Sequence, residues 1–372
     1  MSRTVALLCS LVVALVACAG DAEGGAGSVG ATGADLAACP DPIVITTDWF
    51  PEPEYGGVYQ LTGGEGSIDP ESGAFTGPLA YGDVERRVEV RAGGPFVGFQ
   101  SGSALLYSDD EILLGFLNTD SQITLADSTP TVAVFATIET NPQIIMFDPE
   151  TYDWDSWGDV KESGAVITTF AGAYYTDYLI ATGLVDADQI DPSYDGSPAR
   201  FIAENGALAQ QGFVTQEPYN YEHVFDDWGR PVDWLLIQDS GWEIYSQSLA
   251  IRADKLEDEG VRSCLGALVP ILQQASVDFI EDPGPTNAAI LQAVIDLDSF
   301  WVLSEAGIEN TMRLMDDLDV IANGPNDTLG DFDLDRVDEV IRLGREIGLE
   351  VPGGLTAADV VTNEFIDPSI GR

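Results

Sequence analysis

Aromatic and acidic side chains gather in the segments that follow several short apolar runs of this sequence. Aromatic faces stack on flat rings or cover cations, and carboxylates accept hydrogen bonds from ring amino groups. These residue types predict noncovalent binding of a small ring-containing ligand, although any single aromatic could equally pack in the core or at a hinge. The aromatic residues are Trp49, Phe50, Tyr55, Phe170, Tyr174, Tyr175, Tyr219, Trp242 and Tyr245, and the acids are Asp48, Glu54 and Glu217.

Short strands must position these residues. Because ligands of open α/β sheets bind beyond the carboxyl ends of the strands, aromatics in the following loops are expected to line a cleft. The Gly93-Gly94 and Thr168-Thr169 pairs offer backbone and hydroxyl donors near expected helix starts. Strands are predicted at residues 43–45, 84–90, 130–136, 143–147, 165–169 and 212–215, and residues 62–82 are glycine-rich and turn-like.

The last third of the chain changes to a helical period. Ile290, Val294, Leu297 and Trp301 form one apolar stripe, and residues 337–347 carry a second. Strands that alternate with helices predict an α/β fold with largely parallel sheets. With 372 residues, of which 45% are hydrophobic, the chain is long enough for two lobes.

Residue types for catalysis are scarce. His223 is the only histidine, and no paired-cysteine motif, phosphate-binding loop or serine elbow occurs. Asp331, Asp333 and Asp335 mimic the start of a calcium loop, but Arg336 stands where that loop needs glycine. We interpret this stretch as a helix start with favourably placed acids. The sequence therefore predicts neither an enzyme nor a bound metal or cofactor.

The first residues resemble a bacterial lipoprotein signal. Arg3 precedes an apolar run that is too short to span a bilayer and that ends in Leu15-Val16-Ala17-Cys18. Residues 1–17 are expected to be a signal peptide, with Cys18 as the lipidated residue. Residues 18–39 are rich in Gly and Ala and are expected to be mainly a flexible tether. The alternative is an ordinary secretory signal with an incidental cysteine.

The formal net charge is −48. Such a chain repels nucleic acid and anionic lipid headgroups, which excludes nucleic acid as a partner and leaves the lipid anchor as the expected membrane contact. Because the acids are scattered, we interpret them as a strongly hydrated surface suited to a salty medium. Cys39 and Cys264 remain after the signal, and in an oxidising exterior they form either a disulfide or two buried thiols.

Residues 46–59, TTDWFPEPEYGGVY, resemble the opening segment of the NMT1/THI5-like solute-binding proteins, which carry a D-W-x-P-x-x-x-H/Y-x-G-x-Y pattern after the first strand. Three weaker stretches agree in the expected order. They are RAGGP at 91–95, GFVTQEPY at 212–219 and VTNEF at 361–365. The resemblance covers about residues 42–366.

The resemblance implies a two-lobed type II periplasmic-binding fold with a cleft between the lobes. By analogy, residues 40–137 plus 248–372 form lobe one and 138–247 form lobe two. It also implies an extracytoplasmic, membrane-anchored monomer that delivers a solute to an ABC transporter permease. Trp49 and Tyr55 are implied to stack on the ligand, and Glu217 to orient its polar edge. The full expected site is Asp48, Trp49, Phe50, Glu54, Tyr55, Gly93, Gly94, Thr169, Tyr174, Glu217, Tyr219 and Tyr245.

Substrates of the resembling proteins include thiamine-pyrimidine precursors, riboflavin-like rings, nitrate and sulfonates. Basic residues are scarce near these motifs, with only Arg91 and Arg200 nearby, and an anion site needs dense donors. A neutral or amino-bearing heteroaromatic nutrient is therefore expected, and a nitrate, sulfonate or taurine ligand is the alternative. Tyr55 stands where many relatives have histidine, which leaves the exact ligand open. A pyrimidine-synthesis-type enzyme and a lipoprotein that binds no solute are the remaining alternatives.

Overall fold

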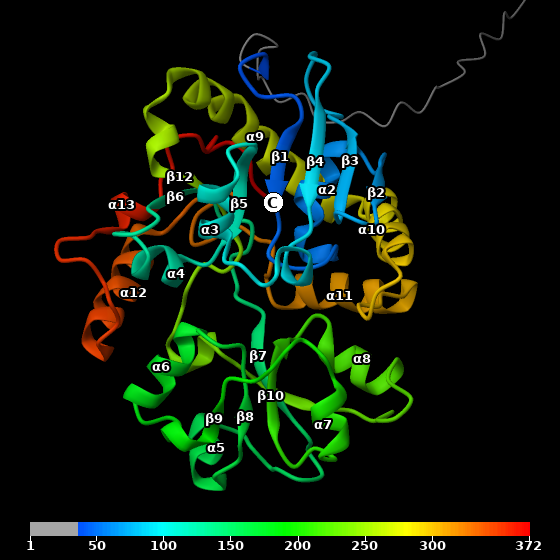
Figure 1. Cartoon of the computed structure of the whole chain (residues 1–372), viewed down its shortest axis with the longest axis vertical. Coiled ribbons are helices and arrows are strands. Elements are labelled where there is room, and N and C mark those ends of the chain that lie inside the picture. Colours follow the sequence, from blue (N-terminus) through cyan, green and yellow to red (C-terminus); the bar gives the residue numbers. More distant parts are fainter. Residues whose placement is uncertain (1–35) are drawn as a thin grey trace, which may run out of the picture.

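The computed structural model describes residues 36–372, which form two α/β lobes. Figure 1 shows the first lobe in the upper half of the view and the second lobe in the lower half. The expected signal peptide (1–17), the expected lipidation site Cys18 and most of the expected tether (18–39) lie outside the described residues.

The first lobe is built on a seven-stranded sheet in the order β2-β3-β4-β1-β5-β12-β6. The central strand, β1, is buried along its whole length, as its Ile-Val-Ile-Thr sequence requires. The strands are β1 (Ile43–Thr46), β2 (Ser67–Asp69), β3 (Ala74–Pro78), β4 (Arg87–Arg91), β5 (Ile112–Leu117), β6 (Thr131–Phe135) and β12 (Ser248–Arg252).

The second lobe is built on a five-stranded sheet in the order β11-β7-β10-β8-β9. It has no helix as long as α9, α10, α11 or α12 of the first lobe (Figure 1). The strands are β7 (Gln143–Phe147), β8 (Ile167–Thr168), β9 (Ile190–Asp191), β10 (Ala209–Phe213) and β11 (Asp233–Leu236), and the helices are α5 (Trp157–Ser163), α6 (Tyr174–Ala181), α7 (Ala199–Ala203) and α8 (Glu217–His223).

Both sheets are mixed, so the expectation of largely parallel sheets is wrong. In the first lobe β1 pairs in parallel with β4 and β5, but β12 is antiparallel to both β5 and β6. In the second lobe β7 is antiparallel to β10 and β11. The strand patterns in the sequence located β1, β4, β6, β7, β8 and part of β10, but they missed β5, β9, β11 and β12. Strand direction depends on the path of the chain between the strands. Strand β12 enters from the second lobe and inserts between β5 and β6.

Residues 62–82 are not only turns, as the sequence predicted, because they contain the β2–β3 hairpin. Gly73 forms the turn with a backbone φ of 69°, a value that residues other than glycine rarely adopt. Phe75 is only 1% exposed and anchors the hairpin on the core. The many glycines masked the alternation of buried and exposed residues that marks β3.

The polypeptide passes between the two sheets twice, once after β6 and once before β12. The connecting segments are residues 136–142 and 237–247. The lobe limits expected from the sequence, 137/138 and 247/248, fall within or at the end of these segments. Two adjacent connections of this kind allow one lobe to rotate against the other.

The remaining helices belong to the first lobe. The apolar stripe at Ile290, Val294 and Leu297 is buried on α10, and Trp301 lies just beyond the end of that helix. The predicted stripe in residues 337–347 is buried on α12, whose N-cap is Asp333 as the helix-start interpretation requires. These helices are α2 (Gly56–Tyr59), α3 (Gly102–Ser108), α4 (Thr119–Thr124), α9 (Glu259–Glu281), α10 (Gly284–Leu297), α11 (Glu305–Asp317), α12 (Leu334–Ile347) and α13 (Ala357–Val360).

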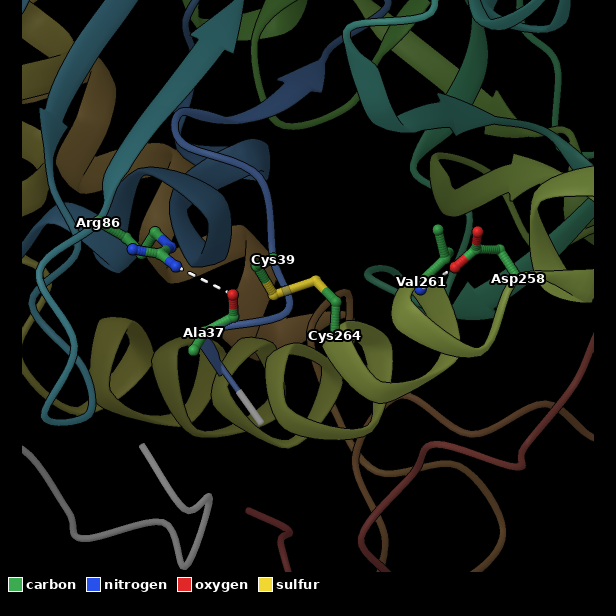
Figure 2. The surroundings of a disulfide bond; sticks show 6 residues. All are labelled: Ala37, Cys39, Arg86, Asp258, Val261 and Cys264. Atoms are coloured by element: carbon green, nitrogen blue, oxygen red, sulfur yellow. Dashed lines mark hydrogen bonds between the residues drawn. A yellow bond between two sulfur atoms is a disulfide. The ribbon is translucent and has the colours of Figure 1, made fainter. Parts of the chain in front are cut away.

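The longest helix, α9, was not singled out from the sequence and forms the core of the first lobe. By length and composition it is the one helix of residues 36–372 that could cross a membrane, but 67% of its apolar stretch is buried in the protein. Figure 2 shows its first turns, where Cys264 is joined to Cys39 by a disulfide across a separation of 225 residues. The bridge therefore ties the segment before β1 to the core helix.

Candidate ligand-binding site

A cavity of about 730 Å³ lies between the two lobes. The first lobe contributes the loop after β1 and the segment before α3, and the second lobe contributes the segments after β8, β9 and β10. Residues 246 and 247, in the second connection between the lobes, form part of the wall. Any molecule held here contacts both lobes and a connecting segment at once.

The loop after β1 is held in place by backbone bonds to its neighbour β4. Thr47 N donates to Arg91 O over 2.9 Å, and the Thr47 hydroxyl donates to Trp49 O over 2.7 Å. Gly93 N also donates to Trp49 O, and a Cβ at Gly93 would meet Thr47 O at 2.4 Å. Only glycine permits this approach, so Gly93 fixes the loop that presents Asp48 and Trp49 to the cavity.

Asp48, Tyr55 and Gln247 form a polar network on the first-lobe wall. The Tyr55 hydroxyl donates to Asp48 Oδ1. Gln247 Nε2 donates to Asp48 Oδ1 over 3.3 Å and to the Tyr55 hydroxyl over 3.0 Å. Tyr55 is 1% exposed, whereas Asp48 is open to the cavity. The network therefore fixes the orientation of the Asp48 carboxylate.

Gln247 takes up its position through an unusual backbone conformation. Its φ is 53°, in the left-handed region that costs a non-glycine residue energy. Gln247 N donates to Asn118 Oδ1 over 2.9 Å, and the Thr137 hydroxyl donates to Gln247 O. These bonds hold the strained residue at the junction of the lobes with its side chain on Asp48.

The acids of the site have raised pKa values. Removal from water raises the pKa of Glu52 well above its ordinary value, and the neighbouring carboxylates of Glu54 and Asp48 raise it further. Burial likewise raises the pKa of Asp48, opposed by the hydrogen bond from Tyr55. Burial raises the pKa of Glu217 to about 7, although Phe213 N donates to its carboxylate over 2.7 Å. The cavity therefore has a strongly negative electrostatic potential when these groups are ionised.

Aromatic rings from both lobes meet at the cavity. The ring centroid of Trp49 is 5.9 Å from that of Phe170 and 5.9 Å from that of Trp301. Phe170 in turn contacts Tyr194 at 4.8 Å. Phe99 lies 6.2 Å from Trp49 and is 54% exposed at the surface of the protein. A flat ligand can therefore be covered by rings of both lobes.

The second-lobe wall is organised around Gln211, on β10. Its Oε1 accepts hydrogen bonds from Phe170 N over 2.8 Å and from the Tyr175 hydroxyl over 2.9 Å. These bonds hold the loop after β8 against β10 and place Phe170 at the cavity. At the end of β10, a Cβ at Gly212 would meet Glu217 Cγ at 2.9 Å, so glycine makes room for the Glu217 side chain.

Glu54 joins the two lobes beside the cavity. Its carboxylate accepts hydrogen bonds from the Thr215 hydroxyl and, over 3.2 Å, from Gln216 Nε2. Gln216 Nε2 also donates over 3.1 Å to Thr311 Oγ1, whose hydroxyl donates over 2.9 Å to Thr215 O. Glu54 is 1% exposed. The described conformation is thus one in which the lobes are hydrogen-bonded to each other.

Five residues expected from the sequence line this cavity, namely Asp48, Trp49, Tyr55, Gly94 and Glu217. The others are close to it but do not line it. Phe50 stacks behind on Trp301, Glu54 bonds the second lobe, and Thr169 precedes Phe170. Gly93 closes the loop described above, and Tyr174, at the start of α6, packs partly buried against a hydrophobic cluster that includes Leu179 and Trp242.

Tyr219 and Tyr245 are directed elsewhere. Tyr219 packs on His223, with ring centroids 4.7 Å apart, and near Gly307 of α11. Tyr245 accepts a hydrogen bond from Asp333 N over 2.8 Å, and the Arg336 guanidinium lies 3.9 Å from its ring centroid. Neither tyrosine lines this cavity, so we no longer expect either one to contact a ligand there.

Several lining residues were not anticipated. Glu52 is an acidic residue of the motif at residues 46–59, so it could have been predicted as a site residue. No local sequence pattern marks Gln211, Tyr194 or Gln247 as site residues. Gln211 lies in the middle of β10, Tyr194 follows β9 and Gln247 lies in a connection between the lobes, so their positions depend on the sheet order. His223 is half exposed on α8, as expected for a surface residue.

The lining has four carboxylates, from Asp48, Glu52, Asp195 and Glu217, and it contains no Lys, Arg or His. Within residues 36–372 no group of three or more His, Cys, Asp or Glu side chains is arranged to hold a metal ion. The cavity can therefore accept hydrogen bonds and stack on rings, but it offers no cationic partner to an anion.

The chain has the two-lobed fold of periplasmic binding proteins, which confirms the predicted architecture. A ligand-binding component of an ABC-type import system from Staphylococcus aureus, solved with zinc bound, is similar with a TM-score of 0.55 and 13% identity, covering 87% of this chain and 97% of its own. An ABC transporter structure from Parabacteroides distasonis is similar with a TM-score of 0.50 and 10% identity, covering 85% and 100%.

A Candida albicans protein, described as defining a new family with the generic periplasmic binding protein fold, is similar with a TM-score of 0.51 and 11% identity over 88% of this chain and 98% of its own. No family model and no curated protein matches this chain. At these identities the likeness establishes the fold. The resemblance to NMT1/THI5-like proteins stays a prediction, because none of these three proteins is described as a member.

Proposed function

We propose that this protein is the extracytoplasmic solute-binding component of an ABC importer and that it carries a small heteroaromatic nutrient between its lobes. The observation that carries the proposal is the cavity of about 730 Å³ at the junction of the two lobes, walled by aromatic and acidic residues. Pockets of this size suit a single small molecule. Two of the similar structures are described as parts of ABC import or transport systems.

The lining favours an amino-bearing or neutral ring over an anion. Nitrate or a sulfonate is normally bound by cationic or densely packed donor groups. The described lining offers four carboxylates and no basic side chain, so an anion would meet repulsion rather than a partner. Trp49 and Phe170 instead provide faces on which a pyrimidine-like or riboflavin-like ring can stack.

Transport requires no bond to be made or broken. A ligand that contacts both walls stabilises the closed arrangement relative to the open one in proportion to its extra contacts. The bond between Glu54 and Thr215 joins the lobes in that arrangement. The permease is proposed to recognise the closed form, and the protein is proposed to act as a monomer anchored through a lipid on Cys18.

Titration of the intrinsic tryptophan fluorescence tests this function, because Trp49 and Trp301 both line the cavity. The panel is 4-amino-5-hydroxymethyl-2-methylpyrimidine, riboflavin, nitrate and taurine. A saturable response to a ring compound is expected. A response to nitrate or taurine alone would overturn the ligand assignment, and the absence of any ligand-induced thermal shift across a wider nutrient panel would favour a lipoprotein without a solute.

The enzyme alternative is tested with the same purified protein. A thiamine-pyrimidine synthase of the alternative kind needs a histidine that serves as substrate and a cysteine-rich motif. In this protein His223 lies on the surface and Cys39 and Cys264 form a disulfide, so neither requirement is met by these residues. Incubation with the bound ring compound should return it unchanged, as judged by mass spectrometry. Conversion to a product would replace the transport proposal.

A further inference from the structure

The first-lobe wall of the cavity has free hydrogen-bond acceptors and no free donor in the Asp48 network. Tyr55 uses its only hydroxyl proton on Asp48. Gln247 uses its amide nitrogen on both Asp48 and the Tyr55 hydroxyl. Because an ionised carboxylate only accepts, the amide nitrogen of Gln247 must face Asp48, and this leaves Gln247 Oε1 as the free atom.

Gln247 Oε1 is a buried acceptor without a partner among the described residues. The residue is 3% exposed and lines the cavity, and its Oε1 has no hydrogen bond. A buried polar atom left in this state costs free energy unless a ligand or water completes it. The two hydrogen bonds to Asp48 both reach Oδ1, so Oδ2 is also available. This wall is complementary to a donor.

The carboxylates around this wall also lack a counter-charge. Glu52 is 5% exposed and lines the cavity with Asp48, while Glu217 faces them from the second lobe. Burial raises the pKa of Glu52, and the neighbouring carboxylates of Glu54 and Asp48 raise it further, so the ionised form of Glu52 is disfavoured without a nearby positive charge. A positive charge inside the cavity would remove this penalty.

A metal ion is a poor candidate for that positive charge. No group of metal-ligating side chains occurs in the described part of the chain, and the cavity is far larger than a metal ion needs. The aromatic rings of Trp49, Phe170 and Tyr194 favour an organic cation, because ring faces attract ammonium and guanidinium groups.

We infer that the ligand is an organic cation whose N–H groups are bound by Asp48, Glu52 and Gln247 while its flat part lies against the adjoining rings of Trp49 and Phe170. This inference rests on the proposed function, since it concerns the same cavity. It narrows the heteroaromatic class to compounds with a protonated nitrogen, such as an aminomethyl, amidine or guanidine substituent on a ring.

Two pyrimidines that differ at one substituent provide the test. The first is 4-amino-5-hydroxymethyl-2-methylpyrimidine, which is neutral at pH 7.5, and the second is the 5-aminomethyl analogue, whose side-chain amine is protonated. Binding to the purified protein is measured by isothermal titration calorimetry. The ammonium compound is expected to bind roughly tenfold to a hundredfold more tightly, as for a charge-assisted hydrogen bond at a buried acceptor. Benzyltrimethylammonium, a cation without N–H donors, should lose most of that advantage.

Two substitutions test whether the first-lobe wall of the cavity causes the preference for the ammonium compound. Asp48→Asn and Glu52→Gln keep the shape and an acceptor oxygen but remove a charge, and together they should reduce the preference to about twofold or less. Asp83→Asn is the matched control, because Asp83 is exposed and lies outside the cavity yet changes the net charge by the same amount per site. It should leave the preference unchanged, which separates local recognition from the general attraction of a chain with net charge −48.

The outcomes separate this inference from the proposed function. Equal affinity for the two pyrimidines would overturn the cation assignment and leave the solute-binding proposal standing. A preference that survives the double variant would remove Asp48 and Glu52 from cation recognition. Binding of nitrate or taurine alone would overturn both the cation assignment and the ring-ligand assignment while the solute-binding role stands. No binding of any probe or panel compound would overturn the solute-binding proposal and the inference with it.

Discussion

The indole of Trp49 in the first lobe contacts the phenyl ring of Phe170 in the second, with ring centroids 5.9 Å apart and planes inclined by 60°. On the second-lobe side, a Cβ at Gly196 would meet the Trp49 ring at 2.7 Å. Trp49 therefore lies in the cavity wall directly against the second lobe, where it can touch a ligand and the opposite lobe together.

Trp49→Ala should weaken ligand binding by about 1–3 kcal/mol, the range for a ring stacked on an aromatic side chain. The measurement is calorimetric titration with the tightest ligand of the panel. Trp234→Ala is the control, because Trp234 lies on the edge strand β11, is 37% exposed and does not line the cavity. An unchanged affinity in Trp49→Ala would remove this ring from the site.

Glu54→Ala should favour the open arrangement of the lobes. The carboxylate accepts hydrogen bonds from Thr215 and Gln216 of the second lobe, and loss of a buried hydrogen-bond partner costs about 1–3 kcal/mol. Ligand affinity should fall roughly fivefold to a hundredfold although Glu54 does not line the cavity. Small-angle X-ray scattering with and without ligand should show a larger radius of gyration for the variant at subsaturating ligand.

Thr215→Val is the milder partner variant for Glu54. It removes the hydroxyl donor but keeps the volume, so it should change the scattering profile and the affinity in the same direction by a smaller amount. Coincident effects in the two variants and less than additive effects in the double variant would show that the residues act as one contact. Fully additive effects would contradict a latch between the lobes.

Removal of the Cys39–Cys264 bridge should lower stability without changing ligand selectivity. The bridge closes a loop of 225 residues, and loss of a native disulfide typically costs about 2–5 kcal/mol. Thermal unfolding of Cys39→Ala/Cys264→Ala, and of the wild type with reductant, should show lower midpoints. Cys39 precedes β1 whereas Asp48 follows it, so the ratio of affinities for the two pyrimidines should be preserved. A changed ratio would mean that the bridge shapes the cavity.

The sequence predicted the parts of the site that follow strongly apolar strands. Ile43-Val44-Ile45 could be recognised as a buried strand, and its parallel pairing with β4 places Asp48 and Trp49 beside Gly94. Glu217 follows β10, a more polar strand at residues 209–213 that the sequence located only in part, at residues 212–215. In these cases a local pattern sufficed, because the residue to be located lies within a few positions of the strand end.

Residues placed by the long-range path of the chain could not be predicted. Gln247 reaches Asp48 only because β12 inserts between β5 and β6, which no local pattern encodes. Tyr245, two residues earlier, has the composition of a ligand-stacking residue, but Arg336 and Asp333 satisfy it elsewhere. The hairpin in residues 67–78 was obscured by the glycines that its turns require.

Glu217→Gln should alter the pH dependence of both stability and binding. Burial raises the pKa of Glu217 from 4.5 to about 7, so its contribution to stability is fully present below pH 4.5 and is lost as pH rises through 7. Since the cavity admits water, this loss should amount to about 1–3 kcal/mol, and the variant should lack it in urea unfolding from pH 4.5 to 8.

Cation affinity should change in the opposite direction with pH. The ionised Glu217 attracts a cation and the protonated form does not, so affinity for the aminomethyl pyrimidine should rise between pH 5.5 and 8 in the wild type and rise less in Glu217→Gln. Asp120→Asn is the control, because burial raises the pKa of Asp120 to about 6 but the residue bonds Trp242 outside the cavity. Asp120→Asn should change how the free energy of unfolding depends on pH, whereas its ligand affinity should depend on pH as in the wild type. If both variants showed the same reduced rise of affinity with pH, folding rather than the charge of Glu217 would govern the pH dependence of binding.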